Sequence, residues 1–79
     1  MKIPKFVELP DYTITVRQFS EETANKMMGA SVYAEWDVDE KEIHLRRNRK
    51  GKDKREDFVH EMEHAIVDWK DYFLGKAER

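Results

Sequence analysis

The stretch DKREDFVHEMEHAIVDWKDYFLG, residues 53–75, is the longest periodic segment in the sequence. At about 100° per residue, most of its apolar side chains fall within an arc of about 120°. They are Phe58, Val59, Met62, Ala65, Ile66, Trp69 and Phe73. Asp53 followed by Glu56 resembles a capping box, and Gly75 is typical of a helix C-terminus. The stretch therefore predicts one long helix whose apolar stripe makes the main core contact.

The segments before this helix are shorter and alternate between apolar and polar positions. Residues 12–19 predict a half-buried strand, and residues 3–7, confined by nearby prolines, predict an edge strand or an extended lead-in. Residues 32–36 and 43–45 alternate again on either side of a polar turn, which predicts a hairpin.

A short helix is predicted between these strands, from Ser20 to Met28, because a capping serine precedes two glutamates and Gly29 follows. The highly charged residues 46–54 predict a loop. The expected fold is α+β: a small antiparallel sheet of about three strands, with a short helix and one long helix packed across it. Residues 1–79 are expected to form a single domain.

The composition excludes several classes of protein. The 79 residues include no cysteine, so disulfides are excluded and a metal would need nitrogen and oxygen ligands. Fifteen basic against seventeen acidic side chains give a net charge of −2, which favours no polyanionic partner. No apolar run approaches the roughly 20 residues of a membrane span, and no signal peptide is recognisable. We expect a cytoplasmic protein that does not enter membranes.

Residues 60–64 of the long helix, HEMEH, form the pattern H-E-x-x-H. Side chains four residues apart on a helix lie one above the other, so His60 and His64 can bind one zinc ion at about 2.0–2.1 Å. Glu61 lies about 100° around the helix from His60, a position that suits a base acting on a zinc-bound water. Because zinc lowers the pKa of such water toward about 7, this pattern predicts hydrolysis of a peptide bond. A plain solvated helix face is the simpler alternative.

The longer stretch VHEMEHAIVDW, residues 59–69, resembles the active-site helix of zincin metallopeptidases. It is most similar to gluzincins, and the order of elements resembles their minimal and phage-type members. The resemblance implies that His60 and His64 bind zinc, that Glu61 activates water, and that Asp68 orients a ligand.

The sequence does not identify the third zinc ligand. Gluzincins take it from a glutamate on a following helix, and Glu78 is the sole glutamate after the motif. Asp68 lies about 12 Å along the helix from His60 and cannot share its ion. The other candidates are His44, a water molecule or a group from a second chain.

The sequence therefore predicts a minimal zinc-dependent metallopeptidase that acts on a peptide or protein. The alternative is a small non-enzymatic binding protein, a regulator or inhibitor with a vestigial zincin motif. Nucleic-acid binding is disfavoured, although seven of residues 46–55 are basic, because that run contains no aromatic residue for stacking. Val67 and Leu74 lie on the histidine side of the helix and suggest a homo-oligomer or a protein partner that covers it.

Overall fold

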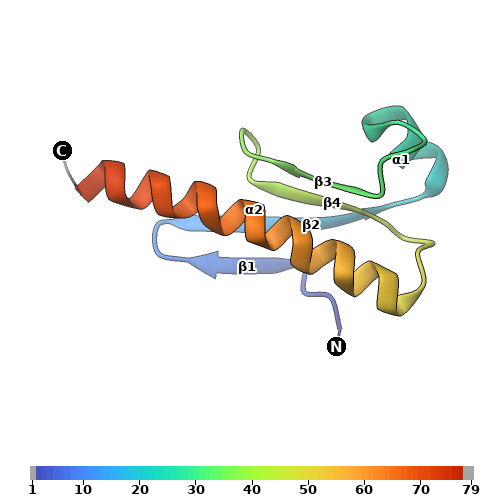
Figure 1. Cartoon of the computed structure of the whole chain (residues 1–79), viewed down its shortest axis with the longest axis horizontal. Coiled ribbons are helices and arrows are strands. Elements are labelled where there is room, and N and C mark those ends of the chain that lie inside the picture. Colours follow the sequence, from blue (N-terminus) through green and yellow to red (C-terminus); the bar gives the residue numbers. More distant parts are fainter. Residues whose placement is uncertain (1, 78–79) are drawn as a thin grey trace.

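The computed structural model describes residues 2–77 and confirms the α+β class (Figure 1). A four-stranded sheet carries a short helix near one end and a long helix across one face. In chain order, the elements are β1 (Phe6–Leu9), β2 (Tyr12–Phe19), α1 (Glu21–Met28), β3 (Ala34–Asp37), β4 (Glu42–Arg46) and α2 (Gly51–Ala77).

The sheet differs from the expected antiparallel one of about three strands, because its strand order is β1-β2-β4-β3 and it is mixed. The lead-in segment forms a strand of its own, β1, which pairs antiparallel with β2. After β2 the chain crosses through α1 and returns along β3, so β4 runs parallel to β2. The predicted hairpin is present, with β3 antiparallel to β4 and at the edge of the sheet.

The core lies between α2 and the face of the sheet that it crosses. Ile14, Ile43 and Leu45 are fully buried, and Phe58 and Ala65 reach them from the helix. The strand residues alternate along the chain and the two helix residues are seven apart. The sequence pattern predicts that such positions are buried.

The apolar stripe of α2 is only partly buried, contrary to the prediction. Val59 is 48% exposed and Phe73 is 41% exposed. Figure 1 shows the C-terminal part of α2 extending beyond the sheet, so the stripe is longer than the surface available to cover it.

Helix α1 has the predicted ends. The Ser20 hydroxyl accepts a hydrogen bond from the Thr23 N–H at 3.3 Å. Gly29 follows the helix with a positive φ of 96°, and its N–H donates to the carbonyl of Asn25 at 3.0 Å. A positive φ suits glycine, which has no Cβ to clash with the backbone.

The predicted ends of α2 are wrong, because the helix begins before Asp53 and continues past Gly75. The helix begins at Gly51, where a loop was expected, because the Lys54 N–H already donates to the Lys50 carbonyl at 2.8 Å. Asp53 therefore lies in the first turn and is not the cap. Gly75 has no positive φ and stays inside the helix, which continues to Ala77.

Two tryptophans fix α2 on the sheet. Trp36 of β3 donates its Nε1–H to the Asp68 carboxylate at 2.6 Å, and Trp69 of α2 donates to the Pro10 carbonyl at 3.2 Å. The first bond joins the helix to one edge of the sheet and the second joins it to the turn between β1 and β2. Rotation of the helix about its axis would break both.

Arg46 is a buried cation that has no acidic partner within residues 2–77. Its guanidinium donates to the carbonyls of Val32 and Gly29 and to the Asn25 side chain, at 2.7 to 2.9 Å. These acceptors lie at the C-terminal end of α1 and in the connection to β3, where the helix dipole favours a cation. Arg46 is therefore a structural residue and not part of a solvated loop.

No helix within residues 2–77 is long and apolar enough to cross a membrane. The cytoplasmic location remains a prediction.

Two leucines provide a matched test of this core. Leu45→Ala should lower the free energy of unfolding by about 2–5 kcal/mol, because the side chain is fully buried. Leu74→Ala, at a residue 59% exposed, should change it by less than about 0.5 kcal/mol. Urea unfolding at low protein concentration measures both, and equal effects would contradict the packing described here.

Candidate metal centre

His60 and His64 lie one turn apart on the exposed side of α2, and their rings converge. Their Nε2 atoms are 3.3 Å apart, and the ring planes meet at 82° with centroids 4.9 Å apart. Two nitrogens that bind one tetrahedral zinc ion at about 2.0–2.1 Å lie about 3.3–3.4 Å from each other. The pair therefore has the spacing of one edge of a zinc coordination tetrahedron.

The described part of the chain supplies two such ligands and no more. Within residues 2–77, no three His, Cys, Asp or Glu side chains are grouped so that they could hold a metal ion. Glu78, the predicted third ligand, lies outside the described residues. The two imidazoles fit zinc as nitrogen ligands, and a further ligand has to come from elsewhere.

Glu61 occupies a cleft between α2 and the edge strand β3. The cleft has a volume of about 400 Å³, and Glu61 and His64 line it from the helix while Glu35 and Trp36 line it from the strand. Glu61 is only 8% exposed, so it does not belong to a solvated helix face.

Burial raises the pKa of Glu61 above its ordinary value, because removal from water disfavours the charged carboxylate. His60 and His64 oppose this shift when they are charged, whereas the nearby carboxylates of Asp57 and Glu35 add to it. A carboxylate with a raised pKa is a stronger base than one in open solvent, which suits proton transfer near neutral pH.

His44, the other candidate for the third ligand, contacts two carboxylates of the sheet. It is 3% exposed on β4, with Nδ1 2.8 Å from Glu35 Oε1 and Nε2 2.9 Å from Glu42 Oε1. Both ring nitrogens therefore face carboxyl oxygens, an arrangement that favours an imidazolium donating two hydrogen bonds. A metal bound at either nitrogen would have to replace one of these hydrogen bonds.

Asp68 makes a different contact from the one that the zincin resemblance implies. Its carboxylate accepts the hydrogen bond from Trp36 Nε1 at 2.6 Å. It thus holds the edge strand against the helix and shapes the wall of the Glu61 cleft, where it is also a lining residue.

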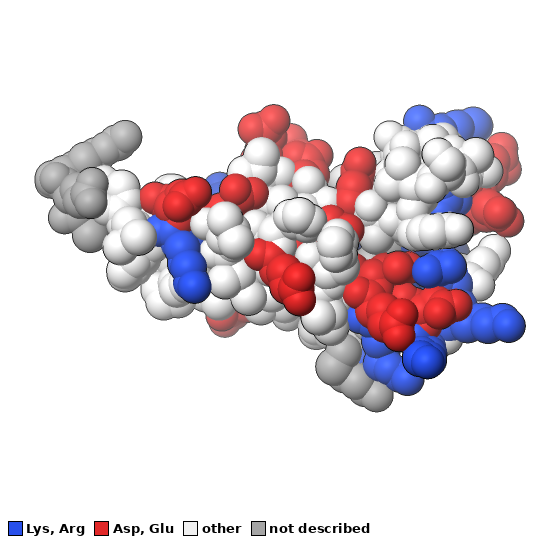
Figure 2. Space-filling view, viewed as in Figure 1, with Lys and Arg blue, Asp and Glu red and all other residues white. Residues whose placement is uncertain are grey.

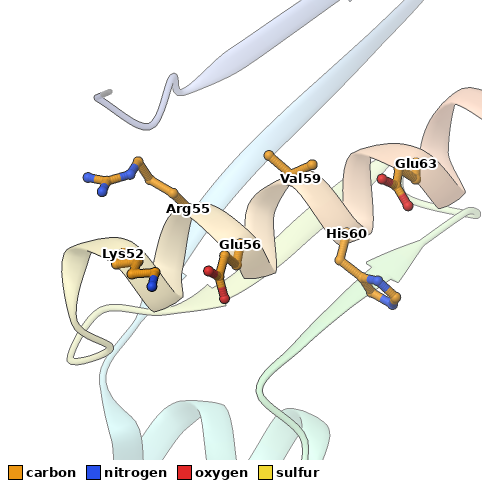
Figure 3. Close-up of a pocket in the computed structure, with 6 residues that line it drawn as sticks. All are labelled: Lys52, Arg55, Glu56, Val59, His60 and Glu63. Atoms are coloured by element: carbon orange, nitrogen blue, oxygen red, sulfur yellow. The ribbon is translucent and has the colours of Figure 1, made fainter.

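His60 also borders a second hollow, a shallow depression of about 620 Å³ on the outer side of α2. Every lining residue belongs to this helix, so no second element forms an opposing wall. Figure 3 shows His60 projecting away from Val59 and Arg55, with two acidic and two basic side chains around the depression. We assign no binding role to it.

The sequence reasoning missed Glu35 and Trp36. Both belong to a predicted strand, but nothing in the alternation shows that this strand lies at the edge beside the helix. Comparison of the chain with protein-family models, curated proteins and solved structures gives no match.

The His44 cluster predicts a pH-dependent stability. Burial alone would lower the pKa of His44, but its hydrogen bonds to Glu35 and Glu42 outweigh burial and raise that pKa above 6.5. A pKa raised by folding stabilises the protein fully below the unfolded value and loses this effect as pH rises through the folded value.

The free energy of unfolding should therefore fall as pH rises above about 6.5, through the raised pKa of His44. His44→Gln should remove that part of the pH dependence, and urea unfolding from pH 5.5 to 9 would show it. An NMR titration of the His44 ring, with Glu35→Gln as a comparison, should give a lower pKa in the variant. A His44 pKa at or below 6.5 in the wild-type protein would disprove the double carboxylate contact.

Proposed function

We propose that this protein is a zinc-dependent hydrolase that acts on peptide bonds. His60 and His64 would bind the metal, and Glu61 would act as the general base. The observation that carries the proposal is the 3.3 Å separation of the two Nε2 atoms, beside a buried carboxylate on the same helix turn.

The chemistry divides between the metal and the side chains. Zinc, when bound, supplies a Lewis acid that makes water acidic enough to lose a proton near neutral pH. Glu61 would act as the proton acceptor inside the cleft, where its raised pKa gives it a higher affinity for protons, and would pass the proton to the departing amine. The backbone of α2 keeps His60 and His64 one turn apart.

The peptide is proposed to lie along β3. Strand β4 is internal because it pairs with both β2 and β3. The outer side of β3 is the edge, and it borders the Glu61 cleft. An extended peptide that pairs with β3 would bring its backbone toward His64 and Glu61. The hydrogen bond between Trp36 and Asp68 keeps this edge beside α2.

Glu61→Gln and Glu63→Gln form a matched pair on one turn of the helix. Glu61→Gln should abolish hydrolysis of a peptide panel, by about 10²-fold or more, because the base is lost. It should keep its zinc and, in chelator, should be at least as stable as wild type, because burial of an ionised carboxylate costs free energy. Glu63→Gln, at an exposed residue, should retain activity.

Zinc content by elemental analysis and turnover by mass spectrometry measure these outcomes. His60→Ala and His64→Ala should each lose zinc. Turnover in Glu61→Gln equal to that of Glu63→Gln would remove Glu61 from the mechanism.

A second candidate function, a non-enzymatic binding protein, is favoured by the exposed apolar side chains of α2. Val67 is 58% exposed and Leu74 is 59% exposed, on a helix that extends beyond the sheet (Figure 1). A protein partner or a second copy of the chain would bury them. Less than a tenth of an equivalent of zinc, with no thermal shift on zinc addition, would favour this function over hydrolysis.

A further inference from the structure

Four cationic side chains from two distant parts of the sequence meet at a cleft near the start of α2. Lys2 and Lys5 come from the segment before β1, and Lys54 and Arg55 come from the first turns of α2. The cleft has a volume of about 350 Å³, and its remaining lining residues are uncharged: Ile3, Gln18 and Gly51. Among the described residues, no carboxylate lines it.

None of these four side chains forms an ion pair within the described residues. Lys54 Nζ donates to the neutral Gln18 amide oxygen at 3.0 Å. Four like charges around one cleft repel each other, and an anion bound among them relieves that repulsion. This concentration of positive charge occurs in a chain whose net charge is −2.

The structure separates these residues from the rest of the basic run. Arg46 is buried among neutral acceptors, and Arg49 pairs with Asp57 at 2.8 Å. Figure 2 shows basic side chains gathered at the end of the molecule where α2 begins, next to an acidic group on the visible face. Of the basic run, only Lys54 and Arg55 line the cleft within the described residues, and Lys2 and Lys5 join them from a part of the chain outside that run.

We propose that this cleft binds the phosphate group of a small phosphorylated molecule. A phosphate carries up to two negative charges and several terminal oxygens, which match three lysine ammonium groups and one forked guanidinium. No aromatic side chain among residues 2–77 lines the cleft to stack on bases, which favours a small molecule over single-stranded nucleic acid. The site lies outside the proposed zinc centre and does not depend on hydrolase activity.

Pyrophosphate is the probe, titrated into metal-free protein in chelator at constant ionic strength and followed by two-dimensional amide NMR. Saturable shifts are expected at Lys5, Gly51 and Lys54. The double variant Lys5→Gln/Arg55→Gln should raise the dissociation constant for pyrophosphate roughly tenfold or more, because two charge-assisted contacts are lost. Lys26→Gln and Lys70→Gln remove exposed lysines elsewhere and should leave it unchanged.

Three results would overturn the proposal. They are the absence of saturable shifts up to about 10 mM pyrophosphate, an equal loss of binding in the Lys26 and Lys70 variants, and binding of an oligonucleotide without binding of pyrophosphate. The measurement involves neither zinc nor turnover. A failure of pyrophosphate binding would therefore leave the hydrolase proposal intact, and a failure of hydrolysis would leave the phosphate-site proposal intact.

Discussion

The contact between α2 and the sheet determines where every other side chain of the helix points. Phe58 and Ala65, two turns apart, belong to the same buried cluster as Leu45 and therefore fix one line along the helix. His60 and His64 lie away from that line and are exposed. Glu61 has an intermediate angle, so it reaches the boundary between helix and sheet and loses most of its contact with water. One hydrophobic interface thus sets two exposed imidazoles, the proposed metal ligands, apart from one buried carboxylate, the proposed base.

The sheet also influences the electrostatics of the site. Glu35 of β3 accepts a hydrogen bond from His44, whose second nitrogen bonds to Glu42. This arrangement holds two carboxylates around one buried cation and keeps Glu35 at the edge strand, where it lines the cleft with Glu61. The negative charge of Glu35 contributes to the raised pKa of Glu61. Burial of Glu61 is the larger cause, so the hydrogen-bond network in the sheet makes a smaller contribution to the raised pKa of the proposed catalytic carboxylate.

Local pattern was sufficient for the parts of the structure that depend on neighbouring residues in sequence. The caps of α1, the hairpin, and the stacking of His60 on His64 follow from spacing and residue type. The parallel pairing of β2 with β4 and the burial of Glu61 depend on how distant segments return to one sheet, which alternation does not encode. The same is true of the bond between Trp36 and Asp68, which joins residues 32 apart.

The position of the histidine pair bears on the kind of zinc site that it can form. His64 lines the cleft that contains Glu61, and His60 lines the depression on the outer side of α2, so an ion bound by both would lie between these two hollows. Structural zinc sites are closed by four protein ligands, whereas catalytic sites keep a position for water or substrate. A third ligand from residue 78 or from a second chain would strengthen binding and still leave one position open. Because His64 shares its hollow with Glu61, an open position on that side would place a water molecule within reach of the base.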